Sequence, residues 1–540
     1  VEARGKKDIV IIGAGVGGLA MAARLAKNKK KFEKIKVLEK NSRPEAGAGR
    51  VGEITLRGPN EEIYRFETGP SLMLLPDIYR KLFTDIGYDM DSFFKIQRVM
   101  PAFRAIFSDN ISVTFSDDQA DMQRQLNALE IDGFQKYQSY MKWADTNLDA
   151  GLPLFIQQDL ASGAPKLPEF LFNCLRYWPL FSHHKQLGQF FDTDRMKALM
   201  SFQDLYIGLS PYEAPAVFSL LQSIEYTRGI YYPIGGFSKI SQALIQVCEE
   251  NGVEIQYDSP VSRILVNAEN NKAMGIEINE KTNVKADIII ANPDLCYSEL
   301  NLLKPQEQRQ GFKELEKTLK HSSSVISICW ATRKRFDTLC HHSVFLSTNY
   351  EKSWEGIFTW EDFGKSLTDC QKSYKDFNFY VHAPSRTDPS ACPEGHDSIM
   401  VLVPSPPVDE SLSLEEARER ERRVKFEVRE AVIQRFEDAG MKDFRSHIVG
   451  ESIRTPTQWR EKYNLRRGSV FGLAHPMQQL SLFRPQPKHP TIRDLYFVGA
   501  STTPGNGVPL VLVGAEQVAE QIERDQDTCP KTQSRSREVT

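Results

Sequence analysis

The apolar positions of the first forty residues follow a strand pattern, then a helix pattern, then a strand pattern again. An apolar run at 8–12 leads into a glycine turn, and residues 16–27 suit a helix. A second strand at 34–39 ends in an acidic residue, Glu39. Strand, glycine turn, helix, strand and acid in this order are typical of a dinucleotide-binding unit.

The glycines of this turn have distinct expected roles. Gly13 permits the tight turn, Gly15 lets the backbone approach a pyrophosphate, and Gly18 lets the helix pack closely on the strand. The helix N-terminus then directs free N–H groups at the phosphates. Glu39 stands where a carboxylate receives two ribose hydroxyls, which disfavours the 2′-phosphate of NADP. A glycine-rich turn without a ligand is the structural alternative.

Strand and helix patterns of the same kind return twice later in the chain. The middle block has a helix at 237–250, strands near 252–255 and 259–266, and a buried strand within 284–293. The last block has a strand at 494–499 and a helix from 508. We therefore predict a discontinuous cofactor-binding domain from residues 1–100, 225–300 and 460–525. Residues 101–224 and 301–459 are predicted to form a substrate-binding, membrane-associating lobe, followed by a disordered tail at 526–540.

Two segments of the inserted lobe have a marked pattern. Residues 166–181 gather aromatics and leucines, which suits either a membrane interface or an ordinary core-facing helix. The charged run from Leu414 predicts a solvated helix face with i,i+4 pairs Glu416–Arg420, Glu419–Arg423 and Glu421–Lys425. Its apolar stripe is expected at Val424, Val428, Val432 and Phe436.

Composition excludes several classes of function. A net charge of −3 gives no reason to expect nucleic acid. Eight scattered cysteines without a CxxC pair argue against zinc and against a disulfide framework, and suit a reducing compartment. Residues 495–515 carry no charge, yet prolines and glycines interrupt them, so a strand, loop and helix fit better than a membrane span. His341 and His342 complete no metal set, and we expect no metal.

Two further motifs carry a resemblance to a known family. Gly47-Ala48-Gly49-Arg50 and Phe66–Ser71 resemble the pattern of FAD enzymes of the amine oxidase and carotenoid desaturase superfamily. Tyr496–Pro509 resembles the C-terminal flavin-contacting motif of bacterial and fungal phytoene desaturases, and the likeness covers nearly all of residues 7–522, closest to fungal members. Ala48 stands where the family usually has glycine, and Thr503 where it commonly has histidine.

The resemblance implies an α/β fold in which a Rossmann-type, glutathione-reductase-like FAD-binding domain carries an inserted α+β substrate domain. It also implies FAD as the cofactor. The residues expected to bind it are Gly13, Gly15, Gly18, Glu39, Arg50, Gly69, Val261, Gly499, Asn506, Gly507, Val508 and Pro509.

The implied reaction introduces C=C bonds into a long apolar polyene of the phytoene type by hydride transfer to flavin N5. Glu225 and His382 are the candidates for the proton acceptor, although each also has a structural interpretation. A polyene isomerase, or a tailoring desaturase or oxidase of another terpenoid, is the alternative that Thr503 motivates. A non-catalytic prenyl-chaperone relative would lack the flavin motifs that this chain keeps.

The expected partners follow from this chemistry. They are the isoprenoid substrate, a lipid surface, and a quinone or O₂ as electron acceptor, with self-association into a homo-oligomer left open. The expected location is intracellular, at the periphery of a membrane.

Overall fold

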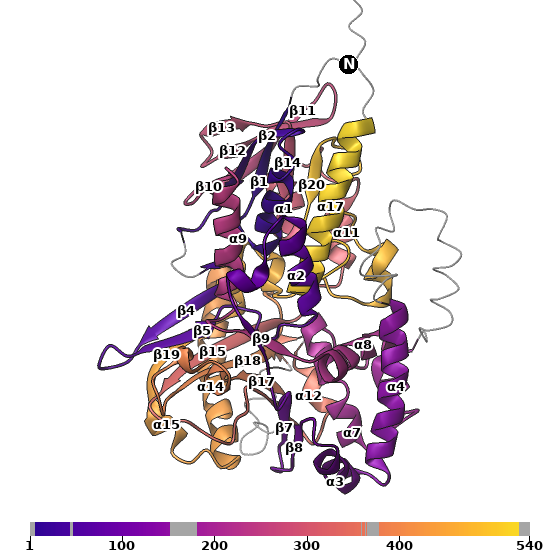
Figure 1. The fold of residues 1–540 in the computed structure, drawn as a ribbon, viewed down its shortest axis with the longest axis vertical. Helices are drawn as coiled ribbons and strands as arrows, with labels where there is room; N and C mark the ends of the chain where they lie inside the picture. Colours follow the sequence, from indigo (N-terminus) through magenta and orange to yellow (C-terminus); the bar gives the residue numbers. More distant parts are fainter. Residues whose placement is uncertain are drawn as a thin grey trace, which may run out of the picture.

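The computed structural model describes residues 6–43, 47–151, 181–357, 359–361, 363 and 377–528. The aromatic segment 166–180 and residues 529–540 of the expected tail lie outside this part of the chain. Two sheets organise the described residues: a five-stranded parallel sheet and a seven-stranded mixed sheet (Figure 1).

The five-stranded sheet draws its strands from three distant parts of the sequence. Its order is β10 (Glu254–Gln256), β2 (Phe32–Leu38), β1 (Lys7–Ile12), β14 (Ile288–Ala291) and β20 (Leu495–Phe497). All neighbouring strands pair in parallel. Parallel strands buried on both faces read as continuous apolar runs, as β14 does with Ile-Ile-Ile-Ala. The domain boundaries themselves stay predictions.

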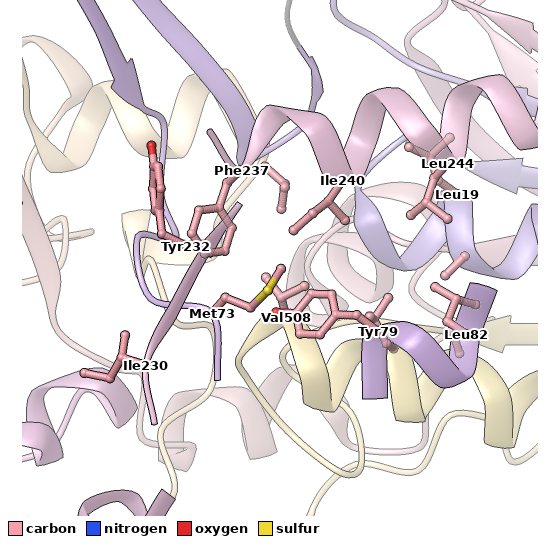
Figure 2. Packing of buried hydrophobic residues seen from close by; sticks show 14 of the residues in the cluster. Leu19, Met73, Tyr79, Leu82, Ile230, Tyr232, Phe237, Ile240, Leu244 and Val508 are labelled. Carbon is pink, nitrogen blue, oxygen red and sulfur yellow. The ribbon is translucent and has the colours of Figure 1, made fainter. Parts of the chain in front are cut away.

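Helices cover one face of this sheet. α1 (Val16–Ala26) packs against both α9 (Ser238–Glu250) and α17 (Val508–Thr528), which lie beside it in Figure 1. The approach of α17 requires a glycine, because a Cβ at Gly17 would lie 2.9 Å from Val511 Cγ1. α2 (Pro76–Asp85) closes the same core, in which Met73, Tyr79 and Ile240 pack together (Figure 2). The opposite face carries the antiparallel strands β11 (Val261–Asn267), β12 (Lys272–Ile278) and β13 (Thr282–Lys285).

The seven-stranded sheet lies at the other end of the molecule. Its order is β19 (Ile448–Arg454), β15 (Ser324–Thr332), β18 (Asp397–Ser405), β17 (Phe379–His382), β16 (His342–Leu346), β7 (Phe103–Phe107) and β8 (Ser112–Phe115). One face packs against α14 (Leu414–Asp438) through its predicted stripe, since Val424, Val428, Val432 and Phe436 are all buried in one cluster with Phe345 and Val401. The other face looks into the interior of the protein, where the site lies.

Shorter elements connect the two sheets. The remaining strands are β3 (Gly47–Ala48), β4 (Val51–Arg57), β5 (Ile63–Glu67), β6 (Ile96–Arg98) and β9 (Tyr231–Pro233). The helical part of the inserted lobe is formed by α3 (Gln119–Leu129), α4 (Gly133–Gly151), α6 (His183–Leu187), α7 (Asp194–Leu199), η5 (Phe202–Ile207), α8 (Leu220–Ser223) and η7 (Ile224–Arg228). Further helices are α10 (Leu295–Tyr297), α11 (Phe312–Thr318), α12 (Lys352–Glu355), α15 (Phe444–His447) and α16 (Pro456–Tyr463).

The structure corrects two expectations about helices. The predicted i,i+4 pairs of α14 are wrong in the described chain: Glu416 completes a capping box with Ser413, and Glu421 turns inward to accept hydrogen bonds from Thr457. The hydrogen bonds of a helix cap and of a buried carboxylate stabilise the protein more than solvent-exposed ion pairs, which contribute little free energy. α17 starts at Val508, as predicted, and continues to Thr528, so its last residues lie in the segment 526–540 that was expected to be a disordered tail.

The uncharged segment 495–515 forms β20, a glycine loop and the start of α17. Within the described ranges, no helix combines the length and the apolar character that a bilayer span requires.

Candidate active site

A large cavity of about 1160 Å³ lies between the two sheets. Its walls include the carboxyl ends of β1, β2 and β20 on one side and residues of β15, β17 and β18 on the other. The carboxyl edge of an open parallel sheet is where such folds bind ligands. The volume exceeds the range of about 300–1,000 Å³ usual for one small ligand, so the cavity has room for more than one.

The glycine turn forms one end of the cavity and leaves no room for side chains. Gly13 has a φ of +92°, and a Cβ on Gly15 would lie 2.6 Å from Asn292 Oδ1. Gly18 does not line the cavity, because it packs on the turn, where a Cβ would lie 2.1 Å from the Gly13 carbonyl oxygen. The turn is therefore shaped for a group that approaches the backbone itself, as a pyrophosphate does.

Two charged residues flank this turn. The Glu39 carboxylate is buried, accepts a hydrogen bond from the Ala14 N–H at 2.9 Å and lines the cavity. Arg50 also lines the cavity, and burial lowers its pKa while the nearby Asp294 carboxylate opposes that shift. A desolvated guanidinium beside a row of backbone N–H groups suits a diphosphate.

The C-terminal motif forms the third side of this end. Gly499, Asn506, Gly507, Val508 and Pro509 all line the cavity. The Asn506 amide donates a hydrogen bond to the Tyr206 carbonyl oxygen at 2.7 Å and so ties the motif to η5 of the other lobe. Of the twelve residues predicted to bind the cofactor, all except Gly18 line this cavity, including Gly69 and Val261. Their contacts with a cofactor stay predictions.

A buried arginine holds the loop before α17. Arg484 is almost fully buried and donates hydrogen bonds only to backbone carbonyl oxygens, among them those of Thr502 at 3.1 Å and Ala500 at 2.6 Å. Desolvation lowers the pKa of Arg484 to about 9. The Arg484 side chain therefore pairs with backbone carbonyl groups that would otherwise need partners in regular secondary structure, and so it holds the loop in place.

The other end of the cavity is apolar and is roofed by the seven-stranded sheet. Alternation along the strands sends Val325 and Ser327 of β15 into the cavity and Ile326 and Ile328 towards α14. Further lining side chains come from the inserted lobe and from the loop after residue 474. They are Leu205, Tyr206, Ile207, Val217, Phe218, Leu220, Leu221, Ile224, Met400, Leu402, Met477, Leu480 and Phe483.

One histidine lines the cavity without any partner. His475 is buried, and among the described residues neither of its ring nitrogens has a hydrogen-bond partner. Burial and the Arg484 charge hold the pKa of His475 well below its usual range, so the ring is neutral. It lies against Gly505, where a Cβ would come within 2.5 Å of Nε2. A buried polar group without a partner costs free energy, which a bound ligand would recover.

Glu225 lies beside the cavity, behind Tyr206. It is buried on η7, directly after the lining residue Ile224, and its Oε2 accepts a hydrogen bond from Gln203 Nε2 at 2.9 Å. Burial raises the pKa of Glu225 to about 7, and the Gln203 and Tyr206 side chains offset this only in part. The carboxyl group therefore titrates near neutral pH, as a general base does.

The side chains behind Glu225 form a chain of hydrogen bonds that all run in the same direction. Gln203 Oε1 accepts from Gln222 Nε2 at 2.9 Å, and Gln222 Oε1 accepts from the Tyr140 hydroxyl at 3.1 Å. Because Tyr140 has a single proton, its oxygen must accept from His183 Nε2, 3.0 Å away. Each donor in the chain thus points towards Glu225.

The far end of this chain is a buried pair of titratable groups. His183 Nδ1 lies 2.9 Å from an oxygen of Asp204, and both side chains are fully buried. If His183 Nε2 donates to Tyr140, a second proton must lie between Nδ1 and Asp204. Desolvation raises the pKa of Asp204 while His183 opposes the rise. His183 and Asp204 therefore share one proton, and this pair fixes the direction of the hydrogen-bond chain.

The second predicted proton acceptor, His382, does not line the cavity. It is fully buried on β17, and desolvation lowers its pKa to about 3. Its Nε2 lies 3.0 Å from His341 Nε2. A neutral ring enclosed by other imidazoles has no direct route to a substrate.

Sequence reasoning named none of Tyr206, His475 and Arg484 as a site residue, because no local pattern predicts that they lie at the cavity. His475 and Arg484 both precede the C-terminal motif by less than thirty residues. A buried imidazole and a buried guanidinium become visible only once the loop is folded.

Comparison with known proteins places this arrangement in a family. A family model described as an NAD(P)-binding Rossmann-like domain matches residues 11–86. A phytoene desaturase from Fusarium fujikuroi is 35% identical over 537 residues, which cover 96% of this chain and 90% of the relative. A zeta-carotene-forming phytoene desaturase from Myxococcus xanthus is 33% identical over 518 residues, covering 96% and 94% of the two chains.

Solved structures agree with the fold. Putrescine oxidase bound to putrescine matches with a TM-score of 0.59 at 13% identity, over 96% of this chain and 99% of that chain. Cyclohexylamine oxidase from Brevibacterium oxydans matches with a TM-score of 0.57 at 12% identity, over 97% and 100%. These likenesses confirm the predicted α/β fold, a Rossmann-type domain combined with a substrate domain. On its sequence, the chain belongs to the phytoene desaturase family of carotenoid desaturases, a family of oxidoreductases.

Proposed function

We propose that this protein is an FAD-dependent desaturase of a long apolar polyene of the phytoene type. The observation that carries the proposal is the large cavity, which joins the glycine turn of a dinucleotide fold to a chamber lined by aliphatic and aromatic side chains. A cofactor and an apolar substrate bound in one cavity would meet near its middle, where Tyr206 and His475 lie.

The residues present fit FAD. Gly15 and Gly49 leave a cradle without side chains, since a Cβ on Gly49 would lie 3.0 Å from Gly15 Cα. Glu39 would hold the ribose and Arg50 the diphosphate, and the unpartnered His475 would gain a hydrogen-bond partner. When bound, FAD supplies the hydride acceptor for an allylic C–H bond.

The apolar chamber supports the substrate class. Side chains such as Leu221 and Met477 offer no hydrogen bonds, so they would recognise a hydrocarbon by shape and by exclusion of water. Phe483 lines the cavity and is 75% exposed, which marks an apolar opening to the surface. We infer that the polyene enters there from a lipid surface.

We propose Glu225 as the group that receives the proton lost beside the hydride. Tyr206, which lines the cavity next to Glu225, would pass the proton from the substrate carbon to the carboxylate. The donors of Gln203, oriented by the chain from His183, stabilise the charged form of Glu225 until that proton arrives. His382 is not supported for this role because it lies outside the cavity.

A polyene isomerase with the same cofactor is the second candidate. Thr503, the residue that suggested this reaction, is not among the described residues that line the cavity. Its N–H donates a hydrogen bond to the Pro485 carbonyl oxygen at 3.2 Å. The difference at this position therefore gives the isomerase no specific support. The presence of a suitably placed base favours net removal of hydrogen.

The proposal is tested by incubating the purified, flavin-loaded protein with phytoene in liposomes, under air or with a quinone. Chromatography should show products with additional conjugated double bonds, together with bleaching and recovery of the flavin absorbance. Isomers without net oxidation would indicate the second candidate. No conversion of phytoene or of other terpenoid polyenes by a flavin-loaded protein would refute both.

A further inference from the structure

Three histidines meet beside the cavity, on the face of the seven-stranded sheet that looks away from α14, in a place that the proposed reaction does not use. His341, His342 and His382 are all buried, and one ring nitrogen from each lies within 4.8 Å of the other two. β16 and β17 set this meeting, because His342 and His382 are direct partners in their antiparallel register. His341 immediately precedes β16, and its Nε2 lies 3.0 Å from His382 Nε2.

Hydroxyl groups orient two of these rings. His341 Nδ1 lies 2.6 Å from Thr387 Oγ1, and His342 Nδ1 lies 2.7 Å from the Tyr380 hydroxyl. If these Nδ1 atoms carry the protons, both Nε2 atoms present lone pairs to the cluster. Histidine ligands of metals commonly donate their second ring N–H to such an outer oxygen.

The cluster is incomplete as a set of hydrogen bonds. His342 Nε2 and His382 Nδ1 are buried and have no partner in the described chain. Leaving a buried polar atom unpaired costs about 1–3 kcal/mol. A shared ion would pair His342 Nε2 and replace the contact between His341 and His382.

We propose that His341, His342 and His382 bind one divalent transition-metal ion of the kind that prefers imidazole, such as Zn²⁺. Zn–N bonds of about 2.0–2.1 Å place tetrahedral ligands about 3.3 Å apart, so the pair at 3.0 Å already has nearly the required spacing. Three imidazoles leave one coordination position for a water molecule.

The cation beside the cluster is already ion-paired. All three rings are buried, and an imidazole binds a metal in its neutral form. The nearest cation that affects His341 is Arg386, and the fully buried Asp397 carboxylate, to which Arg386 is ion-paired, balances its charge. The ion would therefore not face an uncompensated positive charge.

The ion would have a structural role beside the cavity. Tyr380 lines the cavity and connects His342 to Ser71 through a hydrogen bond of 2.9 Å. The Tyr232 ring lies 4.8 Å from the His341 ring, and its hydroxyl donates to the lining residue Glu67 at 2.6 Å. Fixing the three imidazoles would thus fix two side chains that support the cavity.

The test is the metal content of flavin-loaded protein produced in medium supplemented with zinc, measured by mass spectrometry against the flavin content. We expect about one zinc per chain in the unmodified protein and at least tenfold less in H342Q. The control is H396Q, which alters a histidine outside the cluster that bonds to Tyr64, and which should keep its zinc. Zinc K-edge absorption should show nitrogen neighbours at about 2.0 Å.

A second variant covers the case that H342Q does not fold. T387V keeps all three imidazoles but removes the hydroxyl beside His341, so zinc affinity should fall about 10–100-fold. Equal zinc affinity of the unmodified protein and T387V in a titration with Zn²⁺, or no stoichiometric zinc in the unmodified protein after that titration, would overturn the proposal.

Discussion

The replacement of Glu225 by glutamine tests the proposed base most directly. Glutamine keeps the size of the side chain and still accepts the hydrogen bond from Gln203, but it cannot take up a proton. If Glu225 receives the substrate proton, the rate should depend on the fraction of enzyme in which Glu225 is ionised. A purely structural Glu225 would give no such link between rate and ionisation.

The structure sets the expected magnitudes. With the pKa of Glu225 raised by burial to about 7, kcat/KM should rise with pH and level off above pH 7. General bases contribute about 10²–10⁴-fold, so E225Q should lose at least 10²-fold at pH 8 and lose the pH-dependent limb. The control E421Q changes another buried glutamate with a raised pKa, on α14 and outside the cavity, and should leave the profile unchanged.

Stability gives an independent readout of the same pKa. A carboxyl pKa that is raised from 4.5 to about 7 on folding contributes stability that is fully present below pH 4.5 and lost as the pH rises through 7. That change corresponds to roughly 3 kcal/mol. E225Q lacks it, so the unfolding free energy of E225Q relative to the unmodified protein should increase by about this amount between pH 4.5 and 8.

The assay combines initial rates on liposomal phytoene from pH 5.5 to 9 with urea unfolding from pH 4.5 to 8. Absorbance of the bound flavin provides a check that each variant keeps its cofactor. The reasoning fails if E225Q, still flavin-loaded, keeps the rising limb, or if the two proteins show the same dependence of stability on pH.

Three further changes probe other parts of the site. G18A places a Cβ 2.1 Å from the Gly13 carbonyl oxygen, so the purified protein should lack flavin absorbance. R484M leaves five hydrogen-bonded backbone carbonyl oxygens without their donor and should lower the melting temperature and the retained flavin. L221W fills part of the apolar chamber and should slow turnover of phytoene more than that of a shorter polyene, measured by product chromatography.

Each of these predictions has a result that contradicts it. Full flavin content in G18A would show that the helix can shift away from the turn. An unchanged melting temperature in R484M would mean that water replaces the guanidinium. Equal slowing on both polyenes in L221W would place Leu221 away from the substrate.

The cofactor end of the cavity could be predicted from the sequence because its requirements are local. A tight turn, a close approach of backbone and a helix N-terminus are set by a few adjacent residues, such as Gly13 and Gly15. Glu39 ends the next strand of the same unit and lines the same cavity. The resemblance then added Arg50 and the C-terminal motif, which lie on the same cavity.

The substrate end could not be predicted in the same way. Tyr206 and His475 are separated by more than 250 residues and meet only because η5 and the loop before α17 converge on one cavity. Neither has a local pattern that separates it from an ordinary core residue. The buried environment that gives Glu225 its raised pKa likewise comes from distant segments, among them α4 through the chain from Tyr140.

The histidine cluster shows how strand register determines which side chains meet. His342 and His382 share a face of the sheet because Val344 pairs with Tyr380 and His342 with His382. A slip of one residue would turn His382 towards α14 and bring Val381 to the cluster, since neighbouring residues of a strand point to opposite faces. Both strands are apolar and β-prone in either register, so their local sequence does not settle it. The packing of Phe345 and Phe379 against Phe436 on the other face selects the register, and that selection creates the site.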